Sequence, residues 1–263
     1  MPHTIVCLKH SIDVAQLRVD SKTSTPLLEE APKKISDFDK NALEEAIRIK
    51  EKHGGKITIV TMAPWDLGEA LREGLAMGAD EAYALSDPAF EGSDSLCKAE
   101  IMARAIEKMG GGDLILCGEA SIDRYSGQLG PRLAERLGLP QITYVRKMDL
   151  EGNKVVAERD LEDAYEVVEA EMPALVAVTK EINEPRLPTL LQILGASKKP
   201  ITKWGASDLG LSEAEVGERG SAVRRMRCVA PAMERKNIVF KGELGEAVEK
   251  LAKELMREGV VRG

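Results

Sequence analysis

Aromatic residues make up only 3% of this 263-residue chain, and basic residues are not in excess. The 37 lysines and arginines are outnumbered by 44 aspartates and glutamates, which gives a formal net charge of −7. Nucleic acids and anionic membranes attract basic surfaces, and single-stranded nucleic acids also stack on aromatic rings. The composition therefore argues against nucleic-acid binding and against attachment to a membrane surface.

Long apolar runs, clustered cysteines and catalytic histidine patterns are also missing from the sequence. No run approaches the ~20 apolar residues of a membrane helix, and the first residues resemble neither a signal nor a transit peptide. The four cysteines have no metal-site spacing, and the three histidines form no recognisable triad. We therefore expect a cytoplasmic protein with no membrane insertion, no metal site and no catalytic residues of its own. Cys7 and Cys117 lie in apolar runs and are expected to be buried.

Short apolar runs alternate with helix-length amphipathic stretches over the first 180 residues. In the stretch 36–55, Phe38, Ala42, Ala46 and Ile49 recur at helical spacing, and glycines end most such stretches. This alternation predicts an α/β fold with a doubly wound, mainly parallel sheet and helices on both faces. The expected strands are 4–8, 56–62, 81–86, 113–118, 141–145 and 174–180.

The pattern changes after these units. Residues 154–171 predict an antiparallel hairpin added to the sheet, with an acidic turn. Residues 206–235 show little periodicity and predict an extended arm, whereas 241–259 predict a last amphipathic helix. We therefore expect a nucleotide-binding α/β domain over residues 1–194 and a C-terminal arm and helix over 195–263. Leu244, Val248, Leu251 and Leu255 fall on one side of that helix.

The carboxyl ends of the expected strands predict a ligand crevice. It would collect residues 7–10, 36–39, 61–65 and the polar turn that follows Gly118. Ser36 and Asp39 have the spacing of a capping box, and a helix beginning near residues 126–128 would offer free N–H groups to an anion. The Rossmann and P-loop glycine motifs are absent. The residues alone leave open whether this turn binds a nucleotide or is an ordinary helix cap.

Several long blocks, in the same order, resemble the beta subunit of electron transfer flavoproteins, the family that includes the FixA proteins. The blocks are "DFDKNALEEAIRIKEK", "EALREGLAMGADEA", "GLPQITYV" and the hairpin "AERDLEDAYEVVEAEMPALVA". The match runs from "IVCLK" to about Trp204. Ala164 departs from the Gly or acidic residue that the family usually has in the hairpin turn.

The resemblance implies an adenine-nucleotide-binding (HUP-like) architecture and an electron carrier that pairs with an FAD-carrying alpha subunit. The pocket of the beta subunit holds AMP in simple members, and a second FAD that accepts a hydride from NADH in electron-bifurcating members. The implied redox partners are flavin-dependent dehydrogenases such as acyl-CoA dehydrogenases, and a quinone oxidoreductase of the FixC/FixX type. Leu190, in "INEPRLPTLLQIL", would anchor the dehydrogenase. The pocket would use Cys7, Ser36, Asp37, Phe38, Asp39, Met62, Asp123, Arg124, Tyr125, Ser126, Gly127, Gln128, Leu129 and Gly130.

The turn itself departs from the family. Bifurcating members usually read Asp-Gly-Asp-Thr-Ala-Gln, whereas this chain reads Asp-Arg-Tyr-Ser-Gly-Gln over 123–128. The other blocks favour FAD in the pocket, and the turn leaves AMP open. The alternative function is a stand-alone adenine-nucleotide-binding module of the universal-stress type, which would have no use for the region beyond residue 194.

Overall fold

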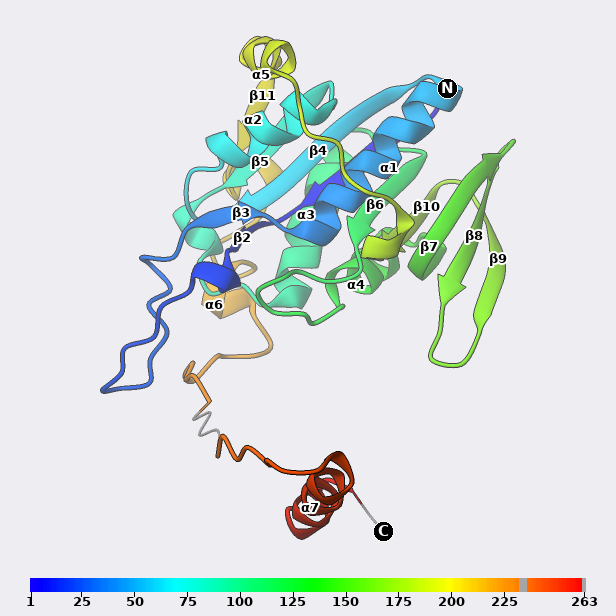
Figure 1. Ribbon diagram of the computed structural model, residues 1–263. Coiled ribbons are helices and arrows are strands. Elements are labelled where there is room, and N and C mark those ends of the chain that lie inside the picture. The colour runs from blue at the N-terminus through cyan, green and yellow to red at the C-terminus, as the bar shows by residue number, and fades with distance from the viewer. Residues whose placement is uncertain (232–235, 262–263) are drawn as a thin grey trace.

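A computed structural model describes residues 1–231 and 236–261, so residues 232–235 of the predicted arm and residues 262–263 of the predicted C-terminal region lie outside the described residues. A nine-stranded sheet runs in the order β11-β5-β4-β1-β6-β10-β7-β8-β9 (Figure 1). Its strands are β1 (His3–Leu8), β4 (Lys56–Ala63), β5 (Glu81–Ser86), β6 (Leu114–Gly118), β7 (Gln141–Glu151), β8 (Lys154–Asp160), β9 (Tyr165–Glu171), β10 (Ala174–Val178) and β11 (Ile201–Trp204).

The predicted fold class is confirmed. Neighbouring strands pair in parallel from β11 to β7, and β7, β8 and β9 then form an antiparallel meander that contains the predicted hairpin. The β1 residues Ile5 and Val6 are both fully buried but belong to different core clusters, because successive side chains of a strand point to opposite faces. Strands buried on both faces explain the continuous apolar runs of the sequence.

Helices cover both faces of the sheet (Figure 1). α1 (Asp37–His53) and α2 (Gly68–Met77) contribute to one core cluster, and α3 (Ser95–Lys108) and α4 (Leu129–Leu137) contribute to the other. α5 (Leu190–Ala196) packs beside α2. The remaining elements are short: β2 (His10–Ile12), β3 (Lys33–Ile35), α6 (Gly217–Gly220) and four 3-10 turns, namely Val14–Gln16, Pro88–Phe90, Lys180–Ile182 and Ser207–Leu209.

The sheet runs past residue 194, the predicted end of the nucleotide-binding domain. β11 pairs in parallel with β5 at one edge, from Ile201 opposite Ala82 to Trp204 opposite Leu85. The start of the predicted arm also packs on the core, because Leu209, Leu211 and Val216 are buried there. An extended path begins only after α6.

The predicted last helix is present as α7 (Leu244–Arg257). It lies apart from the sheet in Figure 1. Its apolar side is open, with Leu244 79% and Val248 56% exposed. An amphipathic helix that leaves this side uncovered is typical of a segment that packs on another surface.

No helix in the described ranges is long and apolar enough to cross a membrane. The expected cytoplasmic location stays a prediction.

Candidate functional site

The buried carboxyl group of Asp39 joins three segments at the carboxyl ends of the central strands. Its Oδ2 accepts a hydrogen bond from the backbone N–H of Lys9 at 2.8 Å, and its Oδ1 accepts one from the N–H of Gly118 at 2.9 Å. Lys9 follows β1 and Gly118 ends β6, so the first turn of α1 is fixed to two neighbouring strands. The first turn of α1 and the ends of β1 and β6, which the sequence predicts to line a crevice, are therefore brought together.

The predicted capping box of Ser36 and Asp39 is wrong. Ser36 occupies the N-cap position of α1, but its side chain makes no capping hydrogen bond. The Asp39 carboxyl does not bond back to the N-cap residue either, since it accepts from the strands instead. Ser36 is fully buried, and its Oγ has no hydrogen-bond partner among the described residues. A buried hydroxyl without a partner is costly and indicates a place for a ligand or a water molecule.

Gly118 allows α1 to approach the sheet. A Cβ atom at this position would lie 2.5 Å from the Cβ of Phe38 and 2.8 Å from Asp39 Oδ1. No side chain larger than hydrogen fits without moving the helix. The glycine that opens the polar turn is therefore a packing requirement of the site.

Lys9 links the first strand to the polar turn. Its ammonium forms an ion pair with Asp123 and a 3.1 Å hydrogen bond with Ser121 Oγ, which in turn donates to Asp123 at 2.7 Å. Burial opposes ionisation of Asp123, but the contacts with Lys9 lower the pKa of Asp123 overall. The turn is thus held in place by a lysine that the sequence analysis did not single out.

Tyr125 stands at the open side of the turn. Its backbone is left-handed, at φ 46°, and its ring centroid lies 5.8 Å from that of Phe38. Its hydroxyl donates to Glu119 at 3.1 Å, while the side chain is 67% exposed. The two rings therefore pack on each other in a tilted arrangement, and the exposed Tyr125 ring leaves one face open to solvent.

The other predicted site residues differ in their surroundings. Cys7 and Gly130 are buried and Met62 and Leu129 are partly buried, on the α3–α4 side of the sheet. Gly127 is partly exposed and has a left-handed φ of 61°. The exposed residues are Asp37, Arg124, Ser126 and Gln128.

Gln128 ties the turn to α3. It is the N-cap residue of α4, and its Oε1 accepts a hydrogen bond from Ser95, the first residue of α3, at 3.0 Å. The first turns of α3 and α4 are therefore adjacent, and Arg132 joins them by donating to Ser95 Oγ at 2.8 Å.

Lys98, one turn into α3, is a further residue that sequence reasoning missed. Burial and the positive charges of Arg124 and Lys9 lower the pKa of the Lys98 ammonium to about 8, and no side chain of a described residue accepts a hydrogen bond from it. In the sequence it looks like an ordinary helix lysine between apolar positions. A partly buried cation beside two others indicates a place for an anion.

His10 does not join this group. The charges that influence it are Lys33, Glu69 and Glu73, on the α2 side, and burial lowers its pKa. The expectation that His10 might line the crevice receives no support from these contacts.

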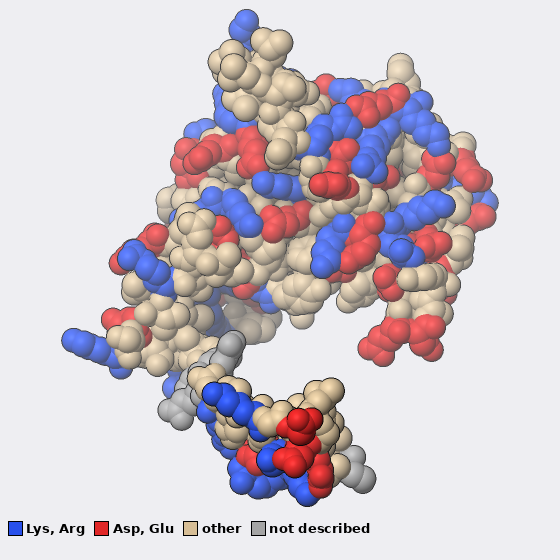
Figure 2. All heavy atoms as spheres, in the orientation of Figure 1, with Lys and Arg blue, Asp and Glu red and all other residues tan. Residues whose placement is uncertain are grey.

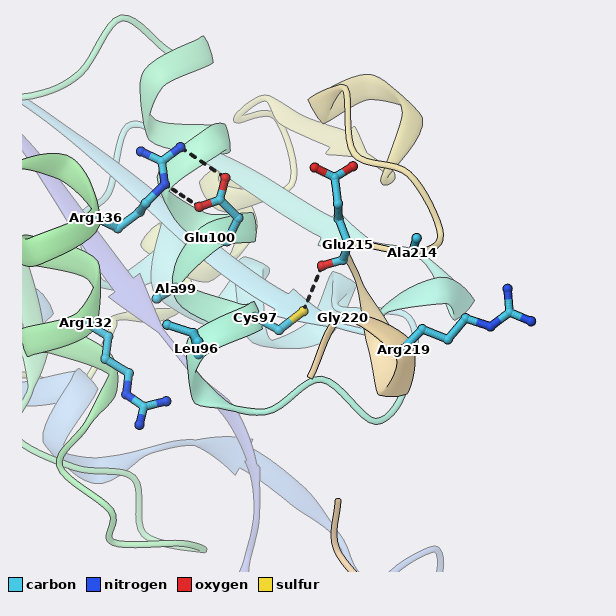
Figure 3. Close-up of a pocket in the computed structure, with 10 residues that line it drawn as sticks. All are labelled: Leu96, Cys97, Ala99, Glu100, Arg132, Arg136, Ala214, Glu215, Arg219 and Gly220. Atoms are coloured by element: carbon cyan, nitrogen blue, oxygen red, sulfur yellow. Dashed lines mark hydrogen bonds and ion pairs between the residues drawn. The ribbon is translucent and has the colours of Figure 1, made fainter. Parts of the chain in front are cut away.

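A separate hollow of about 380 Å³ lies on the α3–α4 side (Figure 3). Arg136 pairs there with Glu100, and the Cys97 thiol donates to the backbone oxygen of Glu215 at 3.4 Å. None of the predicted pocket residues lines this hollow.

Comparison with known proteins assigns the chain to a family. Residues 26–209 match the family model described as "Electron transfer flavoprotein domain". The chain belongs to this family, in its beta-subunit (FixA) branch. It therefore has the role of an electron transfer flavoprotein beta subunit, and the stand-alone module of the universal-stress type is not favoured.

Three curated relatives illustrate the branch. The electron transfer flavoprotein subunit beta of Thermoanaerobacterium thermosaccharolyticum is 43% identical over 258 residues, covering 98% of this chain and 99% of the relative. The caffeyl-CoA reductase-Etf complex subunit CarD of Acetobacterium woodii is 40% identical, covering 86% and 87%. Protein FixA of Azorhizobium caulinodans is 36% identical, covering 88% and 85%.

Leu190 opens α5 in this beta subunit and is 71% exposed. Thr189 and Gln192 form a capping box that starts the helix there, with the Thr189 N–H donating to Gln192 Oε1 at 2.8 Å. Leu187, Leu191 and Leu194 are also exposed. Uncharged side chains cover α5 in Figure 2. The alternative that Leu190 and Leu191 simply pack on the core is wrong.

Some polar and positive groups at these strand ends have no partner among the described residues. The partnerless Ser36 hydroxyl and the Lys98 ammonium offer polar contacts that no described residue uses, and Arg124 adds a positive charge nearby. The chain belongs to a flavoprotein family, so flavin association in general is expected of it. The residues present therefore suit a phosphate-bearing ligand.

The pKa of Asp39 yields a testable pH dependence. Burial raises this pKa to about 7, although the N–H groups of Gly118 and Lys9 oppose the shift. The unfolded chain ionises Asp39 near pH 4. The folded protein therefore keeps a proton that the unfolded chain loses between these pH values, and Asp39 makes the free energy of unfolding fall as the pH rises from about 4 to about 7.

We expect Asp39→Asn to remove this part of the pH dependence. At pH 5 it should also lower the free energy of unfolding by about 1–3 kcal/mol, since an amide offers one acceptor oxygen to two N–H donors. Urea unfolding of both proteins at pH 5 and pH 8 measures each effect. An unchanged pH dependence in the variant would show that Asp39 is already ionised at pH 5.

Proposed function

We propose that this beta subunit pairs with an FAD-carrying alpha subunit and carries electrons between flavin-dependent dehydrogenases and acceptors. The observation that carries the proposal is the crevice at the strand ends, where Asp39 fixes α1 and where the cations Lys9, Lys98 and Arg124 meet a polar turn. Membership of the electron transfer flavoprotein family supports the same role.

The chain's own residues bind and orient the ligand. In this proposal the free N–H groups at the start of α4 and the Lys98 ammonium donate hydrogen bonds to phosphate oxygens. The Ser36 hydroxyl forms a hydrogen bond with another polar group of the ligand. Tyr125, which packs on Phe38 and is exposed, stacks on one face of a planar ring. The flavin supplies the redox chemistry when bound.

We further propose FAD as the occupant of the crevice. The exposed Tyr125 ring suits stacking on a large planar ring, and the Lys98 and Arg124 charges suit a diphosphate better than a single phosphate, since Lys9 is already paired with Asp123. AMP is the alternative occupant. We also propose an electron-bifurcating role. The relative CarD is named as a subunit of a caffeyl-CoA reductase-Etf complex, which supports association with a reductase.

The proposed redox partners use α5. Flavin-dependent dehydrogenases, such as acyl-CoA dehydrogenases, would dock on the exposed leucines around Leu190. The resemblance to the FixA proteins suggests, as a further acceptor, a quinone oxidoreductase of the FixC/FixX type. The α7 helix would pack on the alpha subunit through its open apolar side.

Identification of the bound nucleotides tests the function. The chain is purified with its alpha subunit, denatured, and the released nucleotides are identified by mass spectrometry. Two FAD molecules per heterodimer support FAD in the crevice, whereas one FAD together with one AMP supports a carrier with AMP in the crevice. One FAD alone would contradict both occupants. A colourless complex that releases neither flavin nor AMP would contradict the proposal.

Lys98 gives a prediction about affinity. We expect Lys98→Gln to weaken AMP binding by the nucleotide-stripped heterodimer about tenfold, because a charge-assisted hydrogen bond is lost. A phosphate raises the pKa of Lys98 from its free value of about 8, so wild-type affinity is full below pH 8 and falls as the pH rises above it. Lys98→Arg should flatten this fall, because arginine stays protonated.

Titration calorimetry at pH 7, 8 and 9 measures these affinities. The matched control is Lys147→Gln, which removes an exposed lysine of β7 outside the crevice. Equal affinities for wild type and Lys98→Gln would exclude Lys98 from the phosphate contact.

Leu190 gives a prediction about docking. We expect Leu190→Ala to raise the KM for the dehydrogenase roughly tenfold or more, because exposed apolar anchors dominate small interfaces. Flavin content should not change, since the side chain lies outside the crevice. Steady-state reduction assays with the heterodimer measure KM, and Leu161→Ala, at the hairpin turn, is the control. A loss of flavin in Leu190→Ala would instead assign the residue a structural role.

A further inference from the structure

α1 buries an unusual set of polar side chains on the face that meets the rest of the protein. Asn41, Glu44 and Glu45 are all buried, and Glu44 is only 3% exposed. Charged groups are rarely buried unless they are paired, since leaving water is costly. Their partners come from one segment of the chain, residues 180–186, which lies between β10 and α5.

The carboxylate of Glu44 is saturated by Arg186. Its Oε2 accepts from the backbone N of Arg186 at 3.1 Å and from Nε at 2.8 Å, and its Oε1 accepts from Nη2 at 3.1 Å. Arg48 adds a fourth donor at 3.0 Å. Although burial opposes it, these contacts lower the pKa of Glu44, and Glu51 and Glu44 together raise the pKa of Arg186.

A second contact lies one helical turn away. Asn41 Nδ2 donates to the backbone oxygen of Asn183 at 2.7 Å, and Asn183 Nδ2 returns a bond to the backbone oxygen of Asn41 at 3.0 Å. Asn183 Nδ2 also donates to Glu45 Oε2 at 3.0 Å. The two asparagines therefore bind each other's main chain, which fixes their register.

Beyond the 3-10 turn Lys180–Ile182, the held segment has no regular structure of its own. Residues 183–189 belong to no helix or strand and run beside α1 toward α5 (Figure 1). At the other end of α5, Arg72 Nη1 of α2 donates to the oxygen of Ala196 at 2.6 Å. α5 is thus tethered at its end by α2 and, before its start, by α1.

We propose that Glu44 is a positioning residue for partner docking, which acts by holding Arg186 and, through it, the first turn of α5. This inference rests on the docking role of α5 proposed above. Packing on α2 holds the last turn of α5, whereas the leucines of its first turn are exposed, so the pair of Glu44 and Arg186 fixes the chain that leads into this turn and thereby where Leu190 is presented. The pair is the only bidentate contact between a buried carboxylate and this segment within the described residues.

The test compares Glu44→Gln with wild type in the heterodimer. We expect the KM for the dehydrogenase to rise about tenfold and kcat to stay within about twofold, because docking is disturbed and the flavin is not. Flavin content and absorption spectrum should not change. Amide hydrogen exchange should become faster in residues 184–192 while β1, β4 and β6 keep their protection.

Two further variants sharpen the comparison. Glu107→Gln neutralises another arginine-paired glutamate, on α3 and far from the segment, and should change neither KM nor exchange. Arg186→Lys keeps the charge but loses the bidentate geometry, and should reproduce the rise in KM even where Glu44→Gln fails to fold.

Amide exchange tests whether Glu44 holds the segment, and KM tests whether the held segment matters for docking. Unchanged exchange in residues 184–192 would overturn the tether, and faster exchange with an unchanged KM would overturn its role in docking. If Leu190→Ala also leaves KM unchanged, the docking function of α5 fails instead, and the exchange data still decide whether Glu44 holds the segment.

Discussion

The two hydrogen bonds that Asp39 accepts from the main chains of Lys9 and Gly118 are the contact on which the rest of the site depends. They hold the first turn of α1 over the ends of two central strands, a place that only a glycine at 118 leaves open. The same contact leaves Ser36 without a capping role and brings Lys9 within reach of Asp123. A single carboxyl group thereby fixes the first turn of α1 against the strand ends and positions Lys9, which in turn holds the polar turn.

α1 also connects this crevice to the leucines of α5. Asp39 and Glu44 lie on the same helix, five residues or roughly 8 Å apart along its axis. A helix is rigid over such a distance, so the strand ends and the segment before α5 share one reference element. In this beta subunit the ligand crevice and the exposed helix α5 are therefore built on the same support.

Periodicity predicts much of this fold, because buried parallel strands and amphipathic helices leave strong patterns. The sequence pattern does not predict β11, because this strand has only four residues, two of which are the polar Thr202 and Lys203, and it directly follows a proline. Spacing cannot tell whether Asp39 caps its own helix or binds distant strands. Lys98 reads as an ordinary surface lysine, and only the fold brings it near Lys9. The apolar residues around Leu190 would be expected to be buried, yet in the structure they are exposed.

The two edges of the sheet limit what the molecule can join. β11 offers just four residues, with Lys203 among them, and β9 alternates glutamates with its apolar residues. The tip of the β8–β9 hairpin is crowded with acidic side chains (Figure 2). Short or charged edges discourage strand-to-strand stacking between copies. The sheet edges are thus poor sites for association, and the exposed apolar sides of α5 and α7 remain as the surfaces that can join a partner.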